Sequence, residues 1–218
     1  MEYNGRIVAI GIVGLFNLLR YFYYHQYLEL PFRANFFILT TIFLAIAYWC
    51  GKQFDNVKYY SEKDYLTDTY NRRTVEQSFQ KITQMYRREN LKLGVIMMDL
   101  NRFKEINDTY GHHKGDKLLI HLAVIIKKFV KKNDIVARWG GDEFLILVPD
   151  CKNNFERVYI QGLQKVLANE RFDEFPSVGA SVGFAIYPDD GQNFQELIQI
   201  ADGAMYREKK FRSRTSMS

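Results

Sequence analysis

The N-terminal part of the chain alternates long uncharged runs with short polar segments. Residues 34–51 read ANFFILTTIFLAIAYWCG without a charged side chain, and residues 7–19 form a shorter uncharged run. A helix of 18 residues is ~27 Å long, close to the ~30 Å hydrocarbon core of a bilayer. We therefore predict an all-helical membrane anchor over residues 1–51, with two spans that turn near Pro31.

The shorter run leaves a second interpretation open. Arg20 interrupts it, and a central Arg costs roughly 2.5–3.5 kcal/mol on insertion scales, although its side chain can snorkel. Arg6 followed by a short apolar run also suits a signal peptide. No small-residue cleavage motif follows, which favours the hairpin. The flanking charges, among them Lys52 and Lys58, place the C-terminal part in the cytoplasm.

Beyond residue 63 the pattern alternates between helical and strand periodicity. Asn71 is a suitable N-cap for the first helix, and a Gly-Gly-Asp turn at 140–142 predicts a β-hairpin. We expect a linker helix over 52–63 and then a domain over 64–218. Within it we expect helices over 73–88, 116–131, 155–169 and from 194 onward, and strands over 93–100, 134–139, 143–148 and 177–187. This interleaving predicts an α/β sandwich with a mixed central sheet.

The composition is informative only when the N-terminal and C-terminal parts of the chain are considered separately. The chain has 218 residues and a net charge of +5, but residues 1–58 carry only eight charged side chains. Two cysteines are too few for a disulfide scaffold and have no zinc-site spacing. The basic residues of the second part, such as Lys127 and Lys128, alternate with an apolar stripe. We therefore expect a solvated helix face there and no nucleic-acid partner.

Three carboxylates stand at places where strands end. Asp99 closes the strand 93–100, while Asp142 and Glu143 lie at the tip of the predicted hairpin. If the hairpin lies beside the Asp99 strand, these side chains meet and offer the oxygen ligands that Mg²⁺ prefers. Gly140 and Gly141 would leave room for a polyphosphate. The triplet alone is equally consistent with a plain surface turn.

Further motifs carry a family resemblance. RWGGDEF (138–144) and DLNRFKEINDTYGHHKGD (99–116) resemble the catalytic domain of diguanylate cyclases, the GGDEF family. DYLTDTYNRR (64–73), SVGFAIYPDDG (181–191) and ADGAMYREKK (201–210) agree, in order and at family spacing. The resemblance covers about residues 60–214. It implies a GGDEF fold of the nucleotidyl-cyclase or palm-like type, and condensation of two GTP into cyclic di-GMP with release of two pyrophosphates.

The resemblance also implies roles for individual residues. Asp99, the carbonyl of Leu100 and Asp142 would hold two Mg²⁺ ions per site, with Mn²⁺ as a substitute. Asp142 and Glu143 would act at the ribose 3′-hydroxyl, and Lys104 would stabilise charge on the α-phosphorus. The remaining substrate-binding positions are Asn107 and Asp116 for guanine, Phe103, Gly140 and Gly141 along the substrate, and Lys209 and Arg212 for the terminal phosphates.

Three departures from the family pattern matter. Asn101 stands where the family commonly has a second Asp, so the local charge is altered. Ser213 stands where a phosphate-binding Arg is usual, and Arg212 or Arg214 can substitute. The inhibitory Arg-x-x-Asp motif reads Lys131-Lys132-Asn133-Asp134. Lysine lacks the guanidinium fork, so we expect weak or absent product inhibition.

The resulting expectation is a membrane-anchored diguanylate cyclase. Its partners would be GTP, a second copy in an obligatory homodimer, membrane lipid around the hairpin and possible downstream cyclic di-GMP effectors. Its location would be the bacterial inner (cytoplasmic) membrane, with the catalytic domain in the cytoplasm. Two alternatives remain: a degenerate GGDEF module that binds GTP or cyclic di-GMP without turnover, and a cyclase that makes another cyclic nucleotide.

Overall fold

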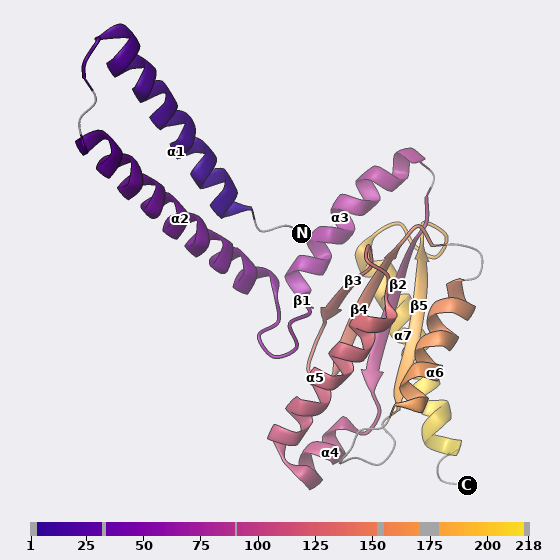
Figure 1. Ribbon diagram of the computed structural model, residues 1–218. Coiled ribbons are helices and arrows are strands. Elements are labelled where there is room, and N and C mark those ends of the chain that lie inside the picture. The colour runs from indigo at the N-terminus through magenta and orange to yellow at the C-terminus, as the bar shows by residue number, and fades with distance from the viewer. Residues whose placement is uncertain (1–3, 32–33, 90, 152–154, 171–178, 216–218) are drawn as a thin grey trace. The chain divides into compact units, whose positions relative to one another are not determined.

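The chain forms two compact units, residues 1–62 and 63–218 (Figure 1). The computed structural model describes residues 4–215 except 32–33, 90, 152–154 and 171–178. The boundary between the units follows the C-terminal end of one long helix, so the predicted linker 52–63 is not a separate helix. Residues 52–62 continue the second helix of the N-terminal unit.

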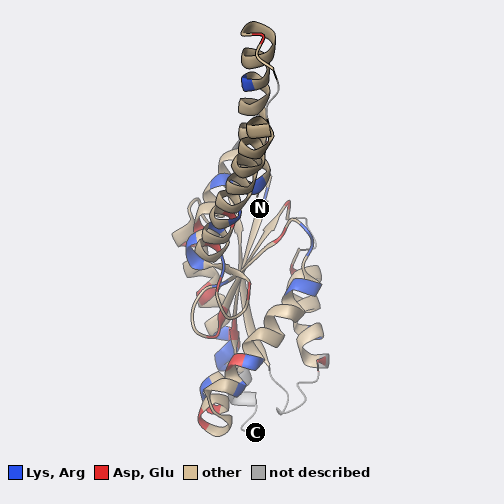
Figure 2. Ribbon diagram, turned by 60° about the vertical axis from the view of Figure 1, so that its left-hand side comes forward, with Lys and Arg blue, Asp and Glu red and all other residues tan. Residues whose placement is uncertain are grey.

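The N-terminal unit is a helical hairpin. Helix α1 (Gly5–Tyr21) runs on into a π-helical turn, η1 (Phe22–Tyr27), and packs against α2 (Ala34–Glu62). Both Gly5–Tyr27 and Ala34–Glu62 are long and apolar enough to cross a membrane. In Figure 2 few residues of these helices have the colours of charged residues along much of their length. Their length and composition make them candidate spans.

Close backbone contact joins the two helices at the open end of the hairpin. A Cβ atom on Gly51 would lie 2.6 Å from the Cα atom of Arg6, so only glycine permits this approach. Asp55, which is 5% exposed, accepts hydrogen bonds from the Gly5 N–H (2.7 Å) and from Arg6 Nε (3.1 Å). Asp55 therefore holds the first turn of α1, whose N–H groups have no partner within the helix.

The C-terminal unit is built on a five-stranded sheet, which is mixed as the sequence predicts; the short edge strand at residues 70–71 was not predicted. In spatial order the strands are β1, β3, β4, β2 and β5; β1 is parallel to β3, and every other pair is antiparallel. Their bounds are β1 (Tyr70–Asn71), β2 (Leu93–Leu100), β3 (Ile135–Arg138), β4 (Glu143–Pro149) and β5 (Ala180–Tyr187). The apolar run 93–100 thus forms the strand expected for it, between β4 and β5.

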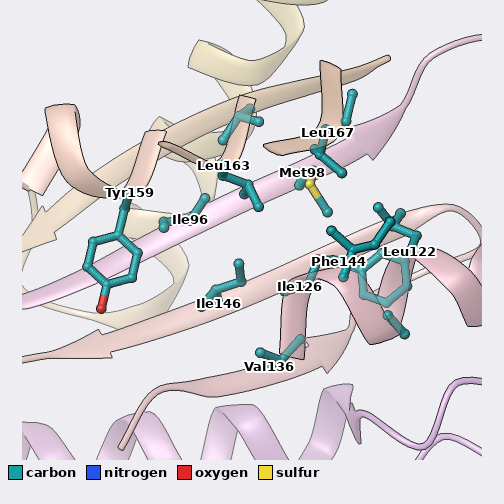
Figure 3. Packing of buried hydrophobic residues seen from close by; sticks show 14 of the residues in the cluster. Ile96, Met98, Leu122, Ile126, Val136, Phe144, Ile146, Tyr159, Leu163 and Leu167 are labelled. Atoms are coloured by element: carbon teal, nitrogen blue, oxygen red, sulfur yellow. The ribbon is translucent and has the colours of Figure 1, made fainter. Parts of the chain in front are cut away.

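Helices cover both faces of the sheet, which explains why all eight residues of β2 are buried. Alternate side chains point to opposite faces, so Val95 and Met97 join one core and Ile96 and Met98 the other (Figure 3). The first core includes α3 (Arg72–Glu89) and α7 (Phe194–Thr215). The second includes α4 (Phe103–Tyr110), α5 (His112–Phe129), the π-helical η2 (Glu156–Gln161) and α6 (Gly162–Asn169).

Most predicted helices are present, with corrections at their ends. Asn71 caps α3 as expected, because its Oδ1 accepts from the Thr74 N–H at 3.0 Å. The prediction of a helix over 116–131, with none between it and the strand 93–100, is wrong at its N-terminal side. Residues 103–110 form α4, and α5 begins at His112. Apolar residues three apart, Phe103 and Ile106, turn α4 towards the core despite its many polar residues.

Helix α7 packs closely on β5 at Gly183. A Cβ atom there would overlap the backbone of Ala201 and Met205. We expect Gly183→Ala to lower the free energy of unfolding by about 1–3 kcal/mol, the range for overpacking. Gly203→Ala on α7 is the matched control, since its nearest neighbour lies 3.6 Å away. Urea unfolding of the control should show a gain of roughly 0.5–1 kcal/mol, and equal effects of both changes would contradict this packing.

Candidate active site at the junction of β2 and β4

Antiparallel pairing brings the predicted carboxylates to one end of the sheet. Asp99 of β2 lies directly opposite Glu143, the first residue of β4. Asp142 precedes Glu143 in the hairpin turn, and its carbonyl accepts a hydrogen bond from the Leu100 N–H at 3.3 Å. The main chain of Leu100 is thus bound to the turn that carries Asp142. The strands predicted to be neighbours are neighbours, and they bring Asp99, Asp142 and Glu143 together.

The cluster has more negative charge than the protein neutralises. Asp99 is 8% exposed, and its Oδ1 lies 2.5 Å from Nζ of Lys209 on α7. Burial raises the pKa of Asp142, and the charge of Asp99 raises it further. Burial likewise raises the pKa of Glu143, with the charges of Asp99 and Asp142 adding to the effect. Among the described residues, the charges of Lys209 and Arg138 offset only part of this repulsion between the three carboxylates.

The donor chemistry suits a hard divalent cation held by two carboxylates. Among the described residues, no three His, Cys, Asp or Glu side chains form a ready metal cluster. Asp99 and Asp142 with the Leu100 carbonyl remain a compatible oxygen set, because Mg²⁺ usually combines one or two carboxylates with substrate phosphates. A bound cation would relieve the repulsion that raises both pKa values.

A long-range ion pair fixes the turn that carries Asp142. Arg138 donates from Nε (3.1 Å) and Nη2 (2.8 Å) to the carbonyl of Gly141, and its Nη1 lies 3.3 Å from Asp64. Burial alone would raise the pKa of Asp64, but hydrogen bonds from Thr67 and the charge of Arg138 together lower it. Asp64 and Arg138 lie in the motifs DYLTDTYNRR and RWGGDEF, but their contact was not predicted from the sequence.

The turn at residues 64–68, which contains Asp64, is also held by Lys127. Nζ of Lys127 on α5 donates to the Asp68 carbonyl (2.6 Å) and lies 3.0 Å from its Oδ2. Lys127 also reaches the carbonyl of Thr67 at 3.3 Å. Lys127 is exposed to solvent, as expected for this helix face, and its ammonium group also makes these contacts. It ties α5 to the start of the domain.

The α4–α5 elbow brings the two predicted guanine-binding residues together. Gly111, with φ at 83°, separates the helices. The side chain of Asn107 packs so closely on Gly115 that a Cβ atom there would overlap its Oδ1. That Oδ1 is buried and has no hydrogen-bond partner. Asp116 is exposed next to Gly115, and Phe103 also packs against this glycine. An unsatisfied amide oxygen beside a carboxylate is an arrangement suited to a ligand that donates hydrogen bonds.

The remaining predicted site residues are Lys104, Gly140, Gly141 and Arg212. Lys104 is exposed on α4, with no ion pair among the described residues. Gly140 accommodates the Glu143 carboxylate, whose Oε2 would lie 2.8 Å from a Cβ atom, whereas Gly141 faces open space. The helix bearing Arg212 is present, but its side chain lies outside the described residues.

Asn101, which stands where the family commonly has a second Asp, is hydrogen-bonded to its neighbours. Ser181 on β5 donates to Oδ1 of Asn101 at 2.7 Å, and the Asn101 N–H donates to the Gly179 carbonyl at 2.8 Å. The neutral side chain is therefore anchored to the neighbouring strand. An additional carboxylate at this position would add negative charge beside a cluster that already has too much.

Comparison with known families agrees with this geometry. The sequence profile described as "Diguanylate cyclase, GGDEF domain" matches residues 61–215. The chain belongs to the GGDEF family. The match covers the whole of the mixed sheet and the helices around it, so the predicted family is confirmed.

Named relatives share this domain. The chain is 37% identical over 150 residues to the bifunctional diguanylate cyclase/cyclic di-GMP phosphodiesterase MucR of Pseudomonas aeruginosa, covering 67% of this chain and 22% of MucR. It is 30% identical over 159 residues to the diguanylate cyclase DgcM of Escherichia coli, covering 71% of this chain and 38% of DgcM. The chain therefore spans less than half the length of either relative.

A solved structure supports the fold. A sensory box/GGDEF family protein from Caulobacter crescentus superposes with a TM-score of 0.62 at 34% identity, over 68% of this chain and 98% of that one. GGDEF diguanylate cyclases generally use divalent metal ions, in agreement with the oxygen donors of the β2–β4 junction.

Because the carboxylates of the cluster repel one another, we expect Asp142 to destabilise the metal-free protein. Because the pKa of Asp142 is raised on folding, stability falls as pH rises from its ordinary value through the raised one. We expect Asp142→Asn in EDTA at pH 7 to raise Tm by no more than about 4 °C, since the charge of a partly buried but solvent-accessible carboxylate contributes at most ~1 kcal/mol.

The gain should vanish below the ordinary pKa of an aspartate and shrink when Mg²⁺ stabilises the wild type. Thermal unfolding at pH 7 and pH 3.5, with EDTA or Mg²⁺, measures all four conditions. A lower Tm for the variant in EDTA at pH 7 would show that Asp142 is not repelled in the folded state.

Proposed function

We propose that this protein is a membrane-anchored diguanylate cyclase that condenses two GTP into cyclic di-GMP and two pyrophosphates. The observation that carries the proposal is the under-neutralised carboxylate cluster of Asp99, Asp142 and Glu143 at the β2–β4 junction. A site of this charge is suited to metal-bound polyphosphate and unsuited to a neutral ligand.

In this proposal Asp99, the Leu100 carbonyl and Asp142 hold two Mg²⁺ ions, or Mn²⁺ in their place. When bound, the ions lower the pKa of the ribose 3′-hydroxyl and neutralise the leaving pyrophosphate. Asp142 accepts the hydroxyl proton as the general base. Glu143 supports the same charged site.

Basic residues would balance the phosphates. Lys209 is bound to Asp99 in the ligand-free protein. We propose that Asp99 would be free to hold a metal ion once Lys209 turns to the terminal phosphates, where Arg212 would lie beside it on α7. Lys104 extends from α4 with no competing ion pair in the described part of the chain, so its charge is available for the α-phosphate.

Guanine would bind at the α4–α5 elbow. Asn107 offers an unsatisfied Oδ1, and Asp116 accepts hydrogen bonds from the guanine N1 and N2 hydrogens. Phe103 lies against Gly115 at the base of this elbow. A base that presents donors to both residues is favoured over adenine, which supports GTP as the substrate.

Two copies are required for the reaction. Each domain would bind one GTP, and two domains facing each other antiparallel would bring each 3′-hydroxyl to the partner's α-phosphate. The homodimer therefore completes the active site.

The hairpin would anchor the enzyme in the bacterial cytoplasmic membrane with the catalytic domain in the cytoplasm. The support is the pair of candidate spans and their apolar surface: Ile7, Phe16 and Trp49 are each more than half exposed. Such a surface is unusual in water and ordinary in lipid.

The direct test is product formation from GTP and Mg²⁺ by purified full-length protein. We expect Asp142→Ala to lower the rate by at least about 10³-fold, because it removes a metal ligand and the proton acceptor. The matched control is Asp189→Ala, an exposed carboxylate paired with Lys92 near the opposite end of β2. The control should retain the wild-type rate.

The alternative is a module that binds nucleotide without turnover. Wild type that binds GTP but forms no cyclic di-GMP would establish that alternative. An active Asp142→Ala variant would refute the assigned catalytic role.

Asp134, at the position of the family's product-inhibition motif, is hydrogen-bonded within the protein. At the inhibitory position, Oδ2 of Asp134 accepts from the Lys131 N–H and from the Tyr159 hydroxyl, both at 2.7 Å. Burial and the Asp134 charge raise the pKa of that hydroxyl, so it remains a donor. The carboxylate is thus engaged within the protein, and Lys131 lacks the guanidinium fork.

We therefore expect no inhibition by low micromolar cyclic di-GMP in initial-rate assays. The double variant Lys131→Arg/Tyr159→Phe restores the fork and removes one of the two hydrogen bonds to Asp134, and it should become measurably more sensitive to product. Strong inhibition of the wild type in the low micromolar range would overturn this expectation.

A further inference from the structure

The helical hairpin contains a cavity near its closed end. Its volume is about 350 Å³, within the usual range for small-molecule sites. It lies where the C-terminal part of α1 and η1 face the first turns of α2. The lining residues are Arg20, Tyr24, His25, Leu30, Pro31, Asn35, Phe36 and Leu39.

Arg20 is held in the wall of this cavity by neutral groups. Its Nη2 donates to the Phe36 carbonyl (3.0 Å) and to Oγ1 of Thr40 (2.7 Å), and its guanidinium lies 4.3 Å above the Phe36 ring. Thr40 in turn lies 3.1 Å from Oδ1 of Asn17, which is 7% exposed. The position of the guanidinium is therefore fixed by both helices.

The charge of Arg20 has no counter-ion within the described part of the chain. No carboxylate forms an ion pair with it, and its Nε is buried without a hydrogen-bond partner. Asp55, the one buried acid of the hairpin's described residues, is bound to Arg6 and Gly5. A guanidinium stays protonated at any physiological pH. An uncompensated charge in an apolar helix pair is costly.

Two further features make the cavity electropositive and amphipathic. Asn35 and Phe36 belong to the first turn of α2, where the helix dipole favours an anion. The ring of His25 is held in the wall by contact between its Nδ1 and the Leu30 carbonyl at 2.6 Å. Leu30, Pro31 and Leu39 provide an apolar side for the rest of a ligand.

We infer that this cavity binds an anionic oxygen group, a phosphate or a carboxylate, carried by a lipid headgroup or by a small amphipathic molecule. The anion supplies the counter-charge that the hairpin lacks at Arg20. The hairpin is then a binding site as well as an anchor, and this conclusion does not depend on the cyclase activity proposed above.

The test uses full-length protein in a neutral maltoside detergent and three probes: dihexanoyl phosphatidylglycerol, inorganic phosphate and hexanoate. Titration calorimetry should detect saturable one-site binding of at least one probe. Arg20→Gln should weaken that binding about ten-fold or more, the size expected for a lost charge-assisted hydrogen bond. Arg20→Lys should weaken it less. Lys52→Gln is the control that removes one positive charge from α2 away from the cavity.

The probes distinguish the sources of the anion. Binding of phosphatidylglycerol alone indicates a lipid headgroup, whereas binding of free phosphate or hexanoate indicates a soluble ligand. Helical content measured by circular dichroism shows whether each variant is folded. If no probe binds the wild type, or if binding to folded Arg20→Gln and Arg20→Lys equals the wild type, the inference is wrong.

Discussion

The register between β2 and β4 is the constraint on which the site depends. It sets Asp99 opposite Glu143 and places Asp142 beside the main chain of Leu100. Like charges at this spacing oppose folding, yet the register cannot slip. A shift of one residue would move every side chain of β2 to the opposite face of the sheet. Because both faces of β2 are buried, each side chain would then enter the other core. The two apolar cores thus hold the carboxylates together against their repulsion.

Two basic residues limit the cost of that arrangement, and they act differently. Arg138 binds the Gly141 carbonyl and Asp64, so it fixes the turn that carries Asp142. Lys209 binds Asp99 directly and leaves Asp142 without an ammonium partner. The first interaction makes the site rigid. The second supplies a partial counter-charge that a divalent cation can replace.

Local pattern was sufficient to predict four of the five strands and the family, because apolar runs and short motifs are visible in sequence; the two-residue strand β1 carries no such run. The strands β2 and β4 follow directly from their continuous apolar residues. Helix α4 was missed because only Phe103 and Ile106 mark its inner face. The pairs Asp64–Arg138 and Asp99–Lys209 were missed for another reason: their residues lie 74 and 110 positions apart. Such contacts follow from topology, which a local pattern does not contain. Arg20 was visible only as an interruption of an apolar run, and its cavity requires the packed hairpin.

The most direct test of the account is the stoichiometry of turnover by purified full-length protein with GTP and Mg²⁺. If two copies combine their carboxylate sites, two pyrophosphates should appear for each cyclic di-GMP, and the rate per chain should rise with protein concentration until the dimer is fully formed. Release of pyrophosphate without cyclic di-GMP, or a rate per chain independent of concentration down to a demonstrated monomer, would contradict it.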